Sequence, residues 1–148
     1  MSLLKAIEKD YLTAYKAKED VKVAVLRILK TAIKNACVEL RREPDDDEVL
    51  DLIARQLKQR KESIEQFTKG GRPELAEQER LEMVVLQEYL PVQLGPEELE
   101  RAVDAVVAET GASGMKDMGR VMQALLAKHK GQVDGKIASA LVRARLAE

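Results

Sequence analysis

The chain has 148 residues, of which 45% are apolar and 34% charged, and its formal net charge is -1. This composition excludes a disordered chain, and the low aromatic content, 3% without tryptophan, favours a helical core of aliphatic side chains over a sheet. No apolar run reaches the roughly 20 residues that a membrane span needs, and a single cysteine excludes an internal disulfide, so we expect a cytoplasmic protein without membrane contact.

Apolar residues recur at helical spacing from the start of the chain. They predict two helices over about 2–18 and 21–42, separated by the polar residues 18–20. Pro44 stops the second helix, because proline lacks an amide hydrogen and restricts the residue before it. The aspartates at 45–47 lack the spaced ligands and the glycine of a calcium loop, so we interpret them as capping groups for the next helix.

A third helix is predicted from Val49 to the glycine pair at 70–71, which can adopt the left-handed conformation common after a helix. Pro73 suits the first turn of a fourth helix. Pro91, Gly95 and Pro96 then break the helical pattern and mark the best domain boundary.

The predicted fold class is therefore all-α with two lobes. Residues 1–92 form an N-terminal bundle of long helices, and residues 96–148 form a small C-terminal domain of three helices. The first helix of this domain covers about 97–110. We expect Ser113 to cap the second helix and Asp134 to cap the third.

Gly119 lies early in the second of these helices, where a glycine costs about 1 kcal/mol relative to alanine. Close helix–helix packing is the preferred explanation, and close approach of a ligand backbone is the alternative.

Charge is segregated along the chain. Residues 1–73 carry a net charge of +3, residues 74–110 carry -8, and residues 111–148 carry +4. The basic C-terminal part could meet a polyanion, although ordinary solvated helix faces are the simpler interpretation.

The turn between the last two helices is the most informative stretch. Lys128 and Lys130 close one helix and Lys136 opens the next, while Gly131 and Gly135 permit tight turns with exposed amides. The start of the last helix adds free amide hydrogens and a positive dipole end, which together predict an anion site able to hold a nucleic-acid phosphate. The alternative is that these lysines only complement the helix dipole and the glycines only form caps.

Signals of catalysis are absent from the sequence. It has no glycine-rich phosphate loop, and the only histidine, His129, cannot form a zinc site with one distant cysteine. Cys37 falls on a buried stripe and is predicted to be a core thiol. We therefore predict no catalytic residue, no metal site and no cofactor.

Several segments resemble the GatB/YqeY family, and stand-alone YqeY-like proteins in particular. They are residues 25–27, 56–63, 89–91, 111–122 and 130–135, so the resemblance extends over essentially the whole chain. It implies that the C-terminal domain is similar to the tail of the B subunit of the glutamine-dependent aspartyl/glutamyl-tRNA amidotransferase, which is implied to hold the tRNA body.

The resemblance thus implies a tRNA-associated binding module, with tRNA as its partner. The expected phosphate contacts are Lys116, Arg120, Lys128, Lys130, Lys136 and Arg143, and the glycines expected to allow close approach are Gly119, Gly131 and Gly135.

Two other functions stay open at this point. The acidic segment 74–110 and an exposed apolar helix face could dock onto a translation or amidotransferase protein. Carbon–nitrogen ligase activity with glutamine as amido donor is implied by the resemblance alone, and we do not expect this chain to catalyse it unaided, because no recognisable motif would bind ATP or generate ammonia.

Overall fold

The computed structural model describes residues 2–147, and every regular element within this range is helical. The all-α prediction is therefore confirmed. The chain divides into two compact units, residues 1–90 and residues 91–148. None of the helices in the described range is long and apolar enough to cross a membrane.

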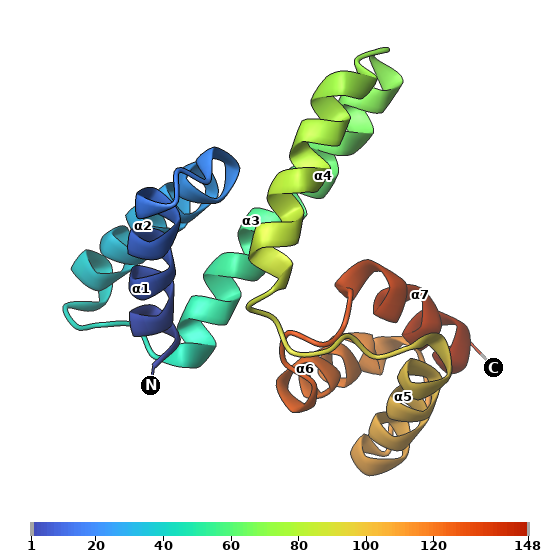
Figure 1. Cartoon of the computed structure of the whole chain (residues 1–148). Coiled ribbons are helices and arrows are strands. Elements are labelled where there is room, and N and C mark those ends of the chain that lie inside the picture. Colours follow the sequence, from blue (N-terminus) through green and yellow to red (C-terminus); the bar gives the residue numbers. More distant parts are fainter. Residues whose placement is uncertain (1, 148) are drawn as a thin grey trace. The chain divides into compact units, whose positions relative to one another are not determined.

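Unit 1 consists of two helical hairpins (Figure 1). Its helices are α1 (Leu3–Lys16), α2 (Asp20–Leu40), α3 (Asp46–Lys69) and α4 (Pro73–Gln87). Helix α2 ends two residues before the predicted position because Arg41 adopts the left-handed conformation, with φ of 58°. The polar break between α1 and α2 uses the same conformation at Lys18, with φ of 57°.

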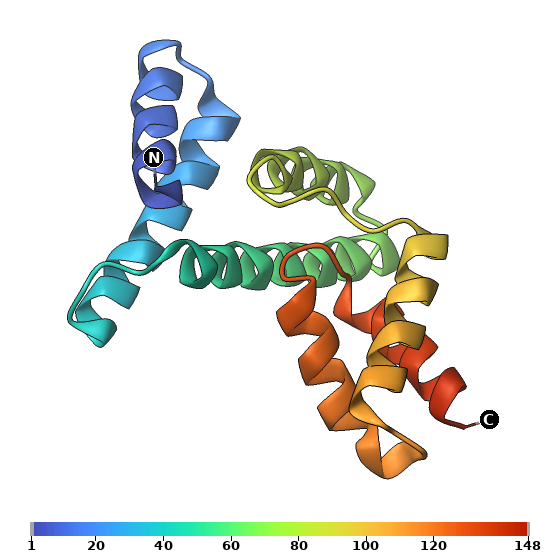
Figure 2. The same cartoon turned by 90° about the horizontal axis from the view of Figure 1, so that it is seen from below.

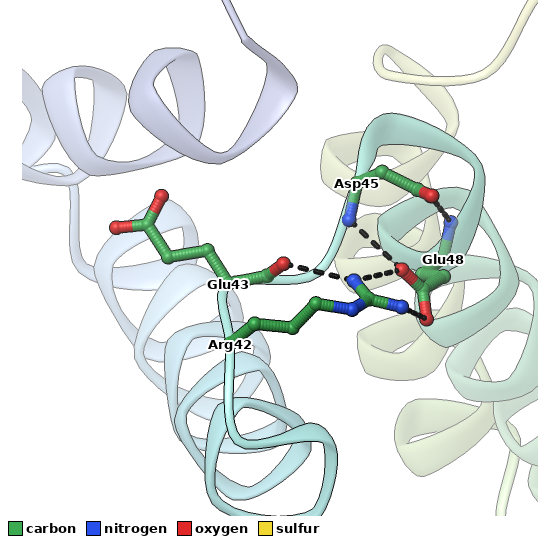
Figure 3. Close-up of polar contacts among 4 residues, drawn as sticks. All are labelled: Arg42, Glu43, Asp45 and Glu48. Carbon is green, nitrogen blue, oxygen red and sulfur yellow. Dashed lines mark hydrogen bonds and ion pairs between the residues drawn. The ribbon is translucent and has the colours of Figure 1, made fainter.

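The loop between α2 and α3 is closed by a polar cluster (Figure 3). Asp45 accepts a hydrogen bond of 2.8 Å from the Glu48 amide, and the Glu48 carboxylate accepts one of 3.1 Å from the Asp45 amide, which forms a capping box. Arg42 adds two hydrogen bonds to the same carboxylate, at 2.7 and 3.1 Å. The capping role predicted for the aspartates is thus confirmed at Asp45.

The core of unit 1 is aliphatic, as the composition predicts. Fully buried side chains from all four helices meet in it; they include Ile7, Leu26, Leu29, Ile53 and Leu86. Two ion pairs join the helices of the second hairpin: Arg60 of α3 lies 3.2 Å from Glu79 and 2.5 Å from Glu82 of α4.

Unit 2 contains three α-helices that contact one another, and one short 3-10 turn. They are α5 (Pro96–Thr110), η1 (Met115–Asp117), α6 (Met118–Lys128) and α7 (Gly135–Leu146). Its core is formed by buried side chains from all three helices: Leu99, Val103, Val106, Val121, Leu125 and Val142.

Residues 91–96, where the sequence predicts the domain boundary, belong to unit 2. The amide of Leu94 donates to the carbonyl of Gln132 at 2.9 Å, and the side chain of Gln132 donates to the carbonyl of Val92 at 3.2 Å. The Gln93 side chain donates to the carbonyl of Gly131 at 2.5 Å. These bonds hold residues 91–95 against the turn between α6 and α7.

Candidate nucleic-acid interface

The start of α6 is organised by Asp117, which corrects one prediction. The Asp117 carboxylate accepts a hydrogen bond of 3.0 Å from the Ser113 amide, so Ser113 does not cap the helix. This bond, together with the nearby charges of Arg120 and Lys116, lowers the pKa of Asp117 below its usual value. Arg120 lies 3.2 Å from the same carboxylate. The Asp117 side chain thus stabilises the loop before α6, where Ser113 was expected to cap the helix.

Gly119 is exposed and lies in the first turn of α6. A methyl group added to its Cα would have no heavy atom within 4 Å. Close helix–helix packing, the preferred explanation from the sequence, is therefore wrong. The open space over the Gly119 backbone, flanked by the exposed side chains of Lys116 and Arg120, forms what we call the α6-start cluster.

The turn between α6 and α7 has a defined conformation. His129 ends α6, and Gly131 takes the left-handed conformation, with φ of 75°, as the sequence predicts for a glycine at this place. Gly135 does not share it, and lies instead as the exposed first residue of α7. The bonds from residues 92–94 hold this turn in place.

Asp134 caps α7, as predicted. Its carboxylate accepts hydrogen bonds from the amides of Lys136 and Ile137, at 2.9 and 3.4 Å. The expectation of free amide hydrogens at this helix start is therefore wrong for these two groups, because the chain's own carboxylate already occupies the position that a phosphate would take.

Three of the predicted cations flank this turn and form what we call the turn cluster: Lys128, Lys130 and Lys136. The ammonium group of Lys128 lies 2.7 Å from the carboxylate of Glu109, at the end of α5. Lys130 is partly buried, whereas Lys136 is exposed.

The predicted contacts do not gather at one point. Arg120 and Lys128 are eight residues apart on α6, which corresponds to about 12 Å along the helix axis. The α6-start cluster and the turn cluster therefore lie at opposite ends of α6, which Figure 2 draws in orange. Arg143 is exposed on α7, which also contacts η1.

The family model for Yqey-like proteins matches residues 4–146 of the chain. This chain belongs to the YqeY-like family. The matched range includes both units and every residue of the two basic clusters.

Fungal relatives carry the name "Altered inheritance of mitochondria protein 41, mitochondrial". The protein from Eremothecium gossypii is 38% identical over 107 residues, covering 70% of this chain and 58% of the relative. That from Lachancea thermotolerans is 36% identical over 103 residues, covering 69% and 54%. That from Pyrenophora tritici-repentis is 28% identical over 141 residues, covering 93% and 77%. The chain thus spans little more than half the length of the first two relatives.

Sequence reasoning missed a groove in unit 1. It lies along α1 and α2, has a volume of about 440 Å³, and carries three cationic side chains, Arg27, Lys30 and Lys34. The sequence did hold a signal, because these residues follow one another at helical spacing next to the buried stripe of α2. Cys37 also lines this groove; it is partly buried and packs against the core of unit 1, so the predicted core thiol lies at the edge of the core rather than inside it.

Proposed function

We propose that this chain is a tRNA-associated binding module whose unit 2 contacts phosphates of folded RNA. The observation that carries the proposal is the α6-start cluster, where an exposed backbone at Gly119 lies between two exposed cations and has no packing partner to explain it. The choice of tRNA rests on the family resemblance to the tail of the tRNA amidotransferase B subunit.

Charge at this cluster favours an anion. The first turn of a helix carries a partial positive charge, and Lys116 and Arg120 add two full charges beside it. The carboxylate of Asp117, whose side chain is only 17% exposed, accepts the hydrogen bond from the Ser113 amide with one oxygen and pairs with Arg120 through the other, so it offsets part of this positive charge. A phosphate at Gly119 would bind Lys116 directly and would compete with Asp117 for Arg120, whose side chain is 56% exposed, and exposed ion pairs contribute little to stability.

The turn cluster supplies a second contact. Lys128 is paired with Glu109, but both side chains are about half exposed, and such surface pairs contribute little to stability. A phosphate can therefore replace Glu109 at small cost. Because the two clusters are separated by about 12 Å along α6, a ligand that contacts both must be an extended polyanion rather than a single phosphate.

The amino-acid composition of unit 2 also indicates how it would recognise RNA. Residues 91–148 contain no phenylalanine, tyrosine or tryptophan. Base stacking, the usual means of holding single strands, has no platform there, whereas contacts to the phosphates of a folded RNA need only positive charge and fitting shape.

The proposal is tested by a salt titration of tRNA binding with the full chain. Arg120→Glu should weaken binding and reduce the slope of log affinity against log salt by about one for each phosphate that the variant no longer neutralises. Arg101→Glu is the matched control, because it makes the same charge change at an exposed position of α5 in the same unit. Lys136→Glu tests the turn cluster in the same way.

Two results would contradict the proposal. One is that the unaltered chain fails to bind tRNA at low salt. The other is that Arg120→Glu and Arg101→Glu lower the affinity equally, which would mean that only the net charge of unit 2 matters.

A second candidate is a module that docks onto a translation or amidotransferase protein. It is favoured by Leu81 and Val84 of α4, which lie three residues apart with exposed fractions of 49% and 53%. A pull-down with and without nuclease separates the two candidates. A partner that survives nuclease and no longer binds Leu81→Glu supports protein docking.

Ligase activity and location are separate proposals. Glutamine- and ATP-dependent amidation of mischarged tRNA by the purified chain alone would establish catalysis. The relatives' names place those proteins in mitochondria, and the cytoplasmic location expected from this sequence stays a prediction, to be checked by fractionation of the source cells.

A further inference from the structure

The groove of unit 1 has two ends of different chemistry. Helices α1 and α2 are joined by only three residues and contact each other, so they run antiparallel. Tyr11 therefore lies opposite Arg27 and Lys30 at one end, and Leu4 lies near Ile33 and Cys37 at the other. We call the whole feature the α1–α2 groove.

The basic end is built around Tyr11. The Arg27 guanidinium donates a hydrogen bond of 3.3 Å to the Tyr11 hydroxyl, and the Lys30 ammonium lies over the Tyr11 ring, 4.2 Å from its centre. Both cations are thereby positioned before any ligand arrives. Lys34 follows one turn after Lys30, in the direction of Cys37, so its side chain lines the groove between the basic end and the apolar end.

The charge of this end is not neutralised within the described chain. No carboxylate within residues 2–147 forms an ion pair with Arg27, Lys30 or Lys34, although such pairs are frequent elsewhere in the molecule. Glu8 and Glu43 line the groove as well but stay outside ion-pair distance of these cations. Three cations against two carboxylates leave a surplus of positive charge.

The other end of the groove is apolar, and the charged group at its edge is a carboxylate rather than a cation. Leu4 and Ile33 are each only 7% exposed, and Cys37 is partly buried beside them. The Glu43 carboxylate borders the groove and points away from Arg42 and Glu48 in the neighbouring loop (Figure 3). A second anionic group would be repelled here, so the groove does not suit a polyanion lying along its length.

We propose that the α1–α2 groove binds an amphiphilic anion, with its single acidic head group at Arg27, Lys30 and Lys34 and its apolar body over Leu4, Ile33 and Cys37. The volume of about 440 Å³ falls within the roughly 300–1,000 Å³ of small-molecule sites. The Tyr11 ring does not serve as a stacking platform for the ligand, because Lys30 lies over it and Tyr15 packs beside it, with 6.2 Å between the two ring centres.

Cys37 provides the readout, because it is the only cysteine of the chain and lines the apolar end. Alkylation of the full chain by iodoacetamide is followed by mass spectrometry with decanoate, decanol or inorganic phosphate present, each below any micelle concentration. We expect decanoate to slow alkylation, decanol to do so only at about tenfold higher concentration because it cannot pair with the cations, and inorganic phosphate to have no effect.

Charge reversal tests the head-group end. Lys34→Glu should weaken decanoate binding about threefold to tenfold, because an attractive charge is replaced by a repulsive one. The matched control is Lys9→Glu, which makes the same charge change at an exposed position of α1 outside the groove, and it should leave binding unchanged. Thermal unfolding of both variants checks that they fold.

The apolar end is tested without any variant. Across hexanoate, octanoate and decanoate, affinity should rise by up to about fourfold for each buried methylene. Any one of three results would overturn the proposal. They are equal protection of Cys37 by decanol and by decanoate, equal decanoate affinity of Lys34→Glu and the unaltered chain, and an affinity that does not depend on the chain length of the fatty acid. Protection of Cys37 by inorganic phosphate or by tRNA at comparable concentration would overturn it too, because the groove would then bind phosphate rather than amphiphiles.

Discussion

Tyr89 donates a hydrogen bond of 2.6 Å to the carboxylate of Asp10, a residue 79 positions earlier in the chain. The bond joins the segment after α4 to α1 and so ties the last residues of unit 1 to its first helix. Burial first, and then the bond to Asp10, raise the pKa of the Tyr89 phenol above its ordinary value near 10. The phenol is thus kept in the form that can donate.

Removing this donor should destabilise unit 1. We expect Tyr89→Phe to lower the free energy of unfolding by about 1 kcal/mol, the usual value for one hydrogen bond. Urea unfolding at neutral pH measures the change. Tyr15→Phe serves as control, because Tyr15 is 61% exposed, and it should have little effect.

The same bond predicts a dependence on alkaline pH. Because the folded pKa of Tyr89 is raised, its contribution is fully present below pH 10 and declines as the pH rises further toward the folded pKa. Above about pH 10 the free energy of unfolding should therefore fall more steeply with pH for the unaltered chain than for Tyr89→Phe. Parallel curves for the two proteins would show that Tyr89 has the same pKa folded and unfolded.

Glu48 predicts the opposite pH dependence. The hydrogen bonds from Arg42 and then from the Asp45 amide lower its pKa from 4.5 to about 2. Its contribution to stability is therefore present above about pH 4.5 and is lost as the pH falls toward 2.

The acid effect is isolated by Glu48→Gln, since glutamine can preserve the capping box without carrying a charge. We expect the stability of this variant to change less between pH 4.5 and pH 2 than that of the unaltered chain. Glu62→Gln, at an exposed position of the same helix, should retain the full change. Identical acid unfolding of the two variants would show that the pair with Arg42 does not persist in solution.

Arg60 should be the most sensitive charged residue of the second hairpin. Its side chain is only 12% exposed, and it contacts both Glu79 and Glu82. Arg60→Met leaves two partly buried carboxylates without their cation, which should lower the free energy of unfolding by about 1–3 kcal/mol.

Two further variants show whether the carboxylates cause this destabilisation. Arg55→Met changes an exposed arginine of the same helix and should cost little. Adding Glu79→Gln and Glu82→Gln to Arg60→Met should recover part of the stability, because the uncompensated charges are gone. No recovery would mean that Arg60 acts through packing of its aliphatic stem instead.

Gly119→Ala separates stability from binding. The open space at this position lets a methyl group enter without a clash, and alanine is the better helix former, so stability should rise by about 0.5–1 kcal/mol. If an RNA backbone approaches Gly119 closely, the same change weakens tRNA binding. Greater stability together with unchanged affinity would remove Gly119 from the interface.

Local signals in the sequence were sufficient for the helices and for part of the candidate site. Asp45 and Asp134 could be predicted as caps because a capping side chain bonds to amides only two or three residues ahead. The sequence could not exclude Ser113 as the cap of α6, because Ser113 and Asp117 both have side chains that can accept a hydrogen bond from a backbone amide. Only the folded loop shows that the Asp117 carboxylate is the acceptor.

Contacts between residues distant in sequence could not be predicted from these local signals. The sequence by itself determined an all-helical chain with aliphatic cores and a basic segment at residues 111–148, since periodicity, composition and capping act over a few residues. Only the tertiary structure decided that Tyr89 bonds to Asp10, that Lys128 pairs with Glu109, and that the α1–α2 groove gathers three cations. Such pairings depend on how helix faces pack against each other, and many pairings share the same local pattern.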